Sequence, residues 1–139
     1  MVRRIMKRAL RIAPAWAVLG MTLLAEPHKD LNRFFAALHV VEASNRVGSI
    51  KGDKGKSLGP LQISKDYWID SKVAGRYEDC VRLDYSKRVA TAYFQHYQPK
   101  ALEDGNWERL ARIHNGGPTG HLRKSTIKHW KKVQKEMSK

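Results

Sequence analysis

Cysteine is almost absent from this chain: Cys80 is the only one in 139 residues. A single thiol cannot form an intramolecular disulfide, so stability must come from packing, unlike in many small secreted domains. The cysteine and histidine residues also lack the spacing of zinc ligands. No activating partner lies near Cys80 in the sequence, so we interpret it as a buried or half-buried structural residue. We expect neither a metal nor an organic cofactor.

Acidic residues are scarce as well, with 13 aspartates and glutamates against 27 lysines and arginines, and the net charge is +14. An excess of this sign attracts polyanions over a long range. Nucleic acid, anionic lipid and bacterial wall polymers all qualify, and charge alone does not select among them. The length and the hydrophobic content of 42% suit one domain with a single core.

The chain also lacks an apolar run of the roughly 20 residues that a comfortable transmembrane helix needs. Its first eleven residues carry five basic side chains and no acidic one, and residues 12–25 are almost entirely apolar. This order is typical of a signal peptide. The cleavage site is imperfect, so residues 1–25 are interpreted as a signal peptide or an uncleaved N-terminal membrane anchor, with a basic amphipathic helix as the alternative. Residues 26–139 would then form one secreted or periplasmic domain with 22 basic and 13 acidic residues, a net charge of +9.

Helical patterns dominate this domain, and strands are hard to find. Apolar residues at helical spacing predict a helix that begins at Pro27 and ends near Asn45. Its buried face carries Leu31, Phe34, Phe35, Leu38 and Val41. Four glycines punctuate residues 46–59, which predicts turns or a small hairpin. The predicted fold class is therefore α+β, a mostly helical single domain with a small β-hairpin or irregular segment after the first long helix.

Four further helices are predicted. The first is expected to begin at Pro60 and to continue to position 69, because proline suits the first position of a helix. The next covers residues 83–97, and Pro99 prevents its continuation. Asn106 is expected to cap a short helix, and Ser125 the last one, because both side chains can accept a hydrogen bond from a free helical amide.

Glu42 lies four residues after Leu38, so it is predicted on the same apolar helix face. A carboxyl group among apolar neighbours loses hydration, which raises its pKa and lets it donate a proton near neutral pH. The alternative is a structural ion pair with Arg46 at i+4. Eleven residues further on, Asp53 follows in the turn-rich segment, where an aspartate often stabilises its own backbone.

A carboxylic acid at the end of a helix, with a second carboxylate in the segment beyond it, is the arrangement of a glycosidase that acts on a polysaccharide. One group protonates the leaving oxygen, and the other attacks the sugar or positions a water molecule. The distance between the two groups decides between these routes. Sequence spacing does not give that distance.

Three sequence blocks resemble the invertebrate-type lysozymes, including the destabilase-like members, over roughly residues 38–133. The first block is Val41-Glu42-Ala-Ser, with Asp53 at the family's spacing. The second is residues 57–63, Ser-Leu-Gly-Pro-Leu-Gln-Ile, followed by Tyr-Trp-Ile-Asp at 67–70. The third and most specific is residues 111–120, Ala-Arg-Ile-His-Asn-Gly-Gly-Pro-Thr-Gly. Residues 125–127 and Trp130 resemble the family's closing helix.

This resemblance implies a lysozyme-like fold and cleavage of the β-1,4 bond between N-acetylmuramic acid and N-acetylglucosamine in peptidoglycan, the expected partner. By position, Glu42 resembles the family's general acid and Asp53 its second catalytic carboxylate. Six further residues are implied to line or shape the cleft that binds the glycan. They are Ser57, Gln62, Tyr67, His114, Asn115 and Gly116.

The chain departs from the family pattern in three ways. Members of the family are usually rich in disulfides, whereas Leu58 stands at one of the family's cysteine positions. The segment between Asp53 and Ser57 is one residue shorter. Some relatives also cleave isopeptide bonds, and Ser64 stands where the family has a lysine, with Lys65 next to it. The sequence therefore resembles a cysteine-poor member of the family.

Two other functions are consistent with the sequence. A lytic transglycosylase has the same fold and a single catalytic glutamate, and residues 59–62 imitate the Gly-x-x-Gln motif of those enzymes. A non-catalytic basic domain could bind wall polymer or nucleic acid through charge alone. No nucleic-acid partner is expected, because no helix carries a pattern for base reading or base stacking.

Overall fold

A computed structural model describes residues 27–139, so the predictions for residues 1–25 lie outside the described residues. Helix α1 (Pro27–Ala43) crosses the molecule and ends two residues earlier than predicted, because Ser44 and Asn45 adopt left-handed backbone conformations with φ of 50° and 61°. The predicted face of α1 is confirmed: three of its apolar residues are buried, and two pack against the core from its edge. Between residues 27 and 139, no helix is both long and apolar enough to span a bilayer.

The segment after α1 forms a small antiparallel sheet, as the glycine-rich sequence predicts. Strand β1 (Lys51–Gly52) pairs with β2 (Ser57–Leu58), and β2 pairs with β3 (Ile63–Ser64). A short 3-10 turn, η1 (Asp53–Gly55), connects the first two strands. The sheet therefore presents Asp53 at the tip of a hairpin.

The prediction that Pro60 begins a helix is wrong. Residues 59–62 form a tight turn in which Gly59 and Gln62 have φ of 80° and 51°. The side-chain amide of Gln62 donates hydrogen bonds to the backbone carbonyls of Gly59 (2.8 Å) and Ile50 (3.2 Å). These bonds pair two backbone carbonyl groups, and the chain then continues into β3. Helix α2 (Lys65–Ser71) begins only after Ser64, whose hydroxyl accepts from the Tyr67 amide at 3.2 Å.

The next helices agree with the sequence more closely. After the 3-10 helix η2 (Tyr77–Val81), α3 has the predicted bounds, Leu83–Tyr97. Pro99 ends α3 and also begins α4 (Pro99–Asp104) at its first position. The predicted cap is confirmed in α5 (Trp107–Gly116), where the Asn106 side chain accepts from the Arg109 amide at 3.1 Å.

The last helix begins later than expected, and Ser125 does not cap it. The chain first forms two 3-10 turns, η3 (Gly120–Leu122) and η4 (Lys124–Thr126), and Ser125 lies within the second one. Thr126 is buried, and its hydroxyl donates to the carbonyls of Gly120 (2.7 Å) and Arg123 (2.8 Å) while accepting from Arg112. Helix α6 (Ile127–Met137) follows and ends with Ser138 as its C-terminal cap.

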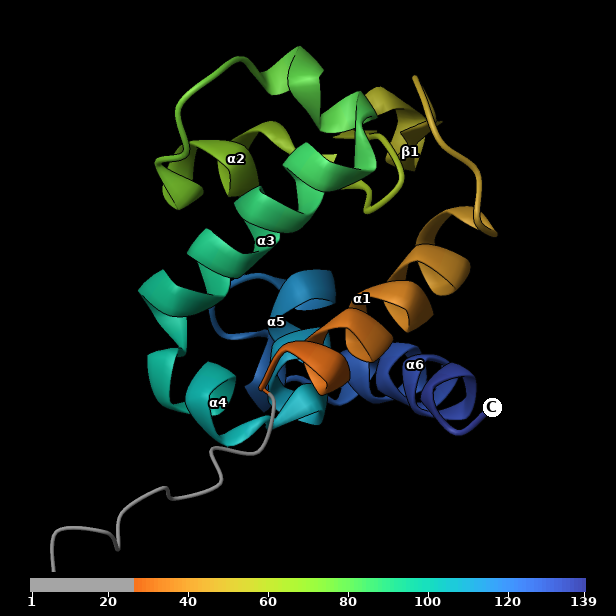
Figure 1. Cartoon of the computed structure of the whole chain (residues 1–139), viewed down its shortest axis with the longest axis vertical. Coiled ribbons are helices and arrows are strands. Elements are labelled where there is room, and N and C mark those ends of the chain that lie inside the picture. The colour runs from red at the N-terminus through yellow and green to blue at the C-terminus, as the bar shows by residue number, and fades with distance from the viewer. Residues whose placement is uncertain (1–26) are drawn as a thin grey trace, which may run out of the picture.

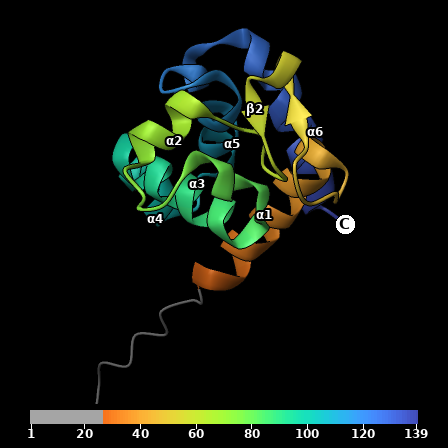
Figure 2. The ribbon, with the colours of Figure 1, turned by 90° about the horizontal axis from the view of Figure 1, so that it is seen from above.

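Helix α1 lies between two groups of elements (Figure 1). The sheet, α2 and η2 lie on one side of it, and α4, α5 and α6 lie on the other, with α3 connecting the two groups. The view from above shows α5 surrounded by the other helices (Figure 2). Cys80 is fully buried in the shared core, and burial raises the pKa of its thiol to about 12, which confirms its structural interpretation.

Candidate active site

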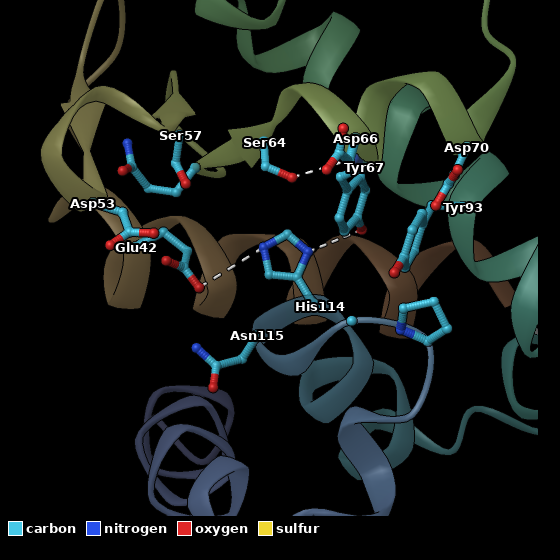
Figure 3. Close-up of a pocket in the computed structure, with 13 residues that line it drawn as sticks. Glu42, Asp53, Ser57, Ser64, Asp66, Tyr67, Asp70, Tyr93, His114 and Asn115 are labelled. Carbon is cyan, nitrogen blue, oxygen red and sulfur yellow. Dashed lines mark hydrogen bonds and ion pairs between the residues drawn. The ribbon is translucent and has the colours of Figure 1, made fainter.

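A polar cleft of about 500 Å³ lies between the sheet and α2 on one side and the end of α5 on the other (Figure 3). Seven of the eight residues expected from the sequence line this cleft. They are Glu42, Asp53, Ser57, Gln62, Tyr67, His114 and Asn115. Gly116 is the exception, because a side chain at this position would collide with Thr126, so Gly116 allows α5 to pack closely against η4.

Glu42 lies in the last turn of α1, and its side chain is 16% exposed. Its Oε1 atom lies 2.7 Å from Nε2 of His129 on α6 and 3.8 Å from Nε2 of His114 on α5. The alternative ion pair with Arg46 does not form, because the Arg46 guanidinium donates to the carbonyl of Ala43 instead. Three helices therefore converge on one carboxyl group.

The surroundings of Glu42 reverse the pKa shift that its apolar helix face predicts. Burial raises its pKa, but the hydrogen bond with His129 and the electrostatic effects of His114, His129 and Lys132 together lower it by more. The net result is a pKa below the ordinary value of 4.5. The prediction of a raised pKa is wrong because helix periodicity reports only neighbours on the same helix, whereas both histidines come from other helices.

His114 lies between Glu42 and Tyr67 in the cleft (Figure 3), and its side chain is 3% exposed. Its Nε2 lies 3.0 Å from the Leu61 carbonyl, which can only accept, so Nε2 carries a proton. Its Nδ1 lies 3.0 Å from the Tyr67 hydroxyl and accepts from it. Burial lowers the pKa of His114, more than the opposing effect of Glu42 raises it, so the ring is neutral at neutral pH.

Tyr67 forms a rigid wall behind His114. Its ring stacks on Tyr93 of α3 with a centroid distance of 3.6 Å and an interplanar angle of 11°. Burial raises the pKa of the Tyr67 phenol well above 10, so the hydroxyl stays protonated. It therefore acts as the donor in the hydrogen bond to Nδ1 of His114. Tyr67 is only 7% exposed and therefore supports the site from behind.

Asp53 lines the same cleft from the opposite side, at the tip of the hairpin. In Figure 3 it lies at the same end of the cleft as Glu42. The residue is exposed and has a left-handed backbone with φ of 48°, a conformation that aspartate tolerates better than most residues. Gly52 precedes it, and a side chain there would collide with the Gln62 amide group. The glycine therefore lets the turn close behind Asp53.

Six further residues that the sequence did not predict also line the cleft. They are Ser64, Asp66, Asp70, Tyr93, Gly117 and Pro118. The spacing of Asp66 and Asp70 at i and i+4 on a short helix is a signal that could have placed them on one face. In the part of the chain that the structure describes, no group of three metal-ligating side chains is present.

The family model for Destabilase matches residues 38–136. The chain belongs to this family, that of the invertebrate-type lysozymes. It is 34% identical to the lysozyme of Ostrea edulis over 66% of this chain and 68% of that protein. It is 35% identical to the invertebrate-type lysozyme of Ruditapes philippinarum, over 57% of this chain and 60% of that protein.

Solved structures support the same assignment for the fold. The crystal structure of Tapes japonica lysozyme superposes with a TM-score of 0.63 at 30% identity, over 74% of this chain and 87% of that one. The lysozyme-like α+β fold predicted from the sequence is therefore confirmed. As a member of the Destabilase family, the chain has the small sheet followed by helices, but it does not use disulfides to hold them, since its only cysteine is free.

Proposed function

We propose that this protein is a muramidase that hydrolyses the β-1,4 bond between N-acetylmuramic acid and N-acetylglucosamine in peptidoglycan, with Glu42 as the general acid and Asp53 as the second carboxylate. The observation that carries the proposal is that these two side chains, from a helix and from a hairpin, line one polar cleft. Membership of the invertebrate-type lysozyme family supports the glycoside hydrolase activity. Nothing in the comparisons favours a transglycosylase or a non-catalytic binding domain.

In this mechanism Glu42 acts in its protonated form, which its lowered pKa makes the minor form at neutral pH, and transfers its proton to the glycosidic oxygen as the bond from that oxygen to the anomeric carbon breaks. The bonding electron pair leaves with the oxygen, and positive charge develops on the sugar. The Asp53 carboxylate stabilises or captures that charge. Water then completes the hydrolysis, and its released proton restores Glu42 to the acid form.

The cleft suits a polysaccharide chain. Its volume of about 500 Å³ is open enough for consecutive sugar rings, and its lining carries hydroxyl and amide side chains in Ser57, Gln62 and Asn115. Such groups form hydrogen bonds with sugar hydroxyl and acetamido groups. The net charge of +9 for residues 26–139 increases the local concentration of the anionic wall around the enzyme.

Glu42→Gln tests the proposal, because the amide keeps the shape of the side chain but cannot donate a proton to the leaving oxygen. Loss of a general acid lowers the rate by about 10²- to 10⁴-fold. Peptidoglycan hydrolysis by purified enzyme measures the effect, and circular dichroism verifies the fold. A Glu42→Gln variant with full activity would refute the assignment.

The mass of the products separates hydrolysis from the transglycosylase alternative. Hydrolysis leaves reducing muramic acid ends, whereas transglycosylation leaves anhydro ends that are lighter by one water molecule. A non-catalytic binding domain would bind peptidoglycan without releasing any product, with Glu42 intact or replaced. We expect only reducing ends from the wild-type enzyme.

Export is also part of this proposal, since the substrate lies outside the cytoplasm. Its support is the basic and then apolar order of residues 1–25, which lie outside the described residues. The expected mature N-terminus follows Ala25. N-terminal sequencing of the secreted protein measures it, and a protein that starts at Met1 and stays in the cytoplasm would contradict export.

A further inference from the structure

His129 is a residue for which the proposed mechanism has no role, although it makes the closest polar contact with Glu42. The two side chains are separated by 87 residues in the sequence and meet where α6 packs against α1. The His129 side chain is 11% exposed, and its Nε2 lies 2.7 Å from Oε1 of Glu42. This distance is in the range of a charge-assisted hydrogen bond between a ring N–H and a carboxylate.

The other ring nitrogen of His129 indicates where the proton lies. Nδ1 is buried, and no described residue offers it a hydrogen-bonding partner. A proton on Nδ1 would leave a buried N–H group without an acceptor, which is the rarer kind of unsatisfied group in proteins. The ring with its only proton on Nε2 avoids this cost and donates that proton to Oε1 of Glu42.

We propose that His129 is a positioning residue for Glu42: its Nε2–H group holds Oε1, so that the proton transferred to the leaving oxygen is carried by Oε2. The inference rests on the proposed role of Glu42 as the general acid. During the reaction the proton leaves Oε2 for the glycosidic oxygen, and Glu42 becomes a carboxylate. The hydrogen bond from His129 strengthens as this negative charge develops and thereby stabilises the product state of the transfer.

Other groups around Glu42 do not duplicate this role. His114 faces it from α5, but its Nε2 is 3.8 Å from Oε1 and donates to the Leu61 carbonyl. Lys132 contributes only positive charge from α6, and the Tyr67 hydroxyl of α2 donates to His114. Asp53 lines the cleft from the hairpin side. His129 is therefore the group that both contacts Glu42 and orients it.

The protonation state of His129 can be measured directly in the folded wild-type protein. Nitrogen-15 NMR of the histidine rings separates a protonated from an unprotonated ring nitrogen. We expect His129 with a proton on Nε2 and none on Nδ1. A ring with its proton on Nδ1 would overturn the proposal, because Nε2 could then not donate to Glu42.

Two substitutions test the effect on catalysis. His129→Leu removes the donor, so we expect kcat to fall about tenfold, the order of effect of a slightly misplaced catalytic group. Because the hydrogen bond that lowers the pKa of Glu42 is then lost, burial raises this pKa, and the basic limb of the pH–rate profile should move to higher pH. His129→Gln can place an amide N–H at the position of Nε2, and we expect it to restore the rate.

The matched control is His96→Gln, which replaces an exposed histidine on α3 and should leave both the rate and the basic limb unchanged. A soluble glycan fragment as substrate keeps the charge of the wall out of the measurement. A His129→Leu variant with wild-type rate and profile, or with a lower rate but an unmoved basic limb, would overturn the proposal. Should that variant fail to fold, the NMR measurement on the wild type decides. Failure of the underlying function would show separately as an active Glu42→Gln variant.

Discussion

The two candidate catalytic carboxyl groups lie at one end of the same cleft in opposite kinds of environment. Glu42 is mostly buried at the end of a 17-residue helix, and groups from two other helices surround it. Asp53 is exposed in η1, the turn at the tip of the hairpin between β1 and β2. Tertiary packing therefore fixes Glu42, whereas local turn geometry fixes Asp53.

This difference fits a division of roles between the two groups. An acid must gain and lose a proton, and a buried site with nearby hydrogen-bond donors controls both forms. A carboxylate that stabilises positive charge on the sugar needs only to remain ionised. Exposure to water favours the ionised form of a carboxyl group. The comparison predicts that substitutions near Glu42 change the pH dependence of the reaction, whereas substitutions near Asp53 change its rate.

The largest effect that tests this comparison is expected for Asp53→Asn. The amide is nearly isosteric but carries no charge, so it removes the stabilisation of the developing positive charge on the sugar. We expect kcat to fall about 10²- to 10³-fold, as when one electrostatic partner of a transition state is lost. Because Asp53 is exposed, the free energy of unfolding should change by no more than about 0.5 kcal/mol.

A double substitution sharpens the same prediction. If both carboxyl groups act in one reaction, the variant with Glu42→Gln and Asp53→Asn should be little slower than Glu42→Gln alone, because residues that act as a unit have strongly non-additive effects. Fully multiplicative losses would indicate independent roles. An Asp53→Asn variant with wild-type activity would leave Glu42 as the single carboxyl group, as in a lytic transglycosylase.

A smaller effect is expected from Gly52→Ala, which tests whether turn geometry positions Asp53. Gly52 has an ordinary extended backbone with φ of −111°, so conformational freedom does not explain the glycine. Instead, a methyl group there would collide with the Gln62 side chain. Overpacking of this kind costs about 1–3 kcal/mol, and a displaced Gln62 would shift the hairpin tip. We expect kcat to fall about tenfold, a modest loss for a shifted catalytic group.

Gln62→Ala provides the control for this collision. The double variant with Gly52→Ala and Gln62→Ala should be no less stable than Gln62→Ala alone, because the colliding amide is gone. Thermal unfolding of the three variants measures this coupling. Additive losses of stability would show that Gly52 is needed for another reason.

The sequence predicts those parts of the molecule whose causes are local. The bounds of α3 and the Asn106 cap follow from apolar periodicity and from one side chain within reach of an amide. The rule that proline begins a helix is correct at Pro99 and fails at Pro60. At Pro60 the turn closed by Gln62 and the pairing of β2 with β3 outweigh the local preference.

The candidate site shows the same limit. Seven of the expected residues line the cleft, and all seven are predicted from motif positions. This succeeds because the motifs of the family mark positions that its common fold brings together. The direction of the pKa shift of Glu42 could not be predicted in this way. It depends on His129, which no local pattern connects with Glu42 across 87 residues.

The smallest expected effect concerns stability on the Glu42 side of the cleft, where His114 is buried in its neutral form. Its folded-state pKa is lowered by burial, so the unfolded chain binds a proton more readily. The stabilisation is therefore complete above the unfolded pKa of about 6.5 and is lost as the pH falls through the lower, folded pKa. Glu42, with its lowered pKa, keeps its contribution above 4.5 and loses it only below that value.

These two pH windows can be separated by His114→Gln, whose amide can contact Leu61 and Tyr67 but does not titrate. In the wild type we expect the melting temperature to decline as the pH falls below about 6.5, before the carboxyl groups become protonated. In His114→Gln the decline between pH 6.5 and 4.5 should be smaller, and what remains there comes from His121, whose pKa burial also lowers. Below 4.5 both proteins lose the contribution of Glu42, whose pKa in the folded protein lies below that value. His96→Gln, an exposed site, should follow the wild type. A wild-type melting temperature that is flat between these values would mean that His114 is protonated in the folded protein, and both histidines near Glu42 would then need a new assignment of their protons.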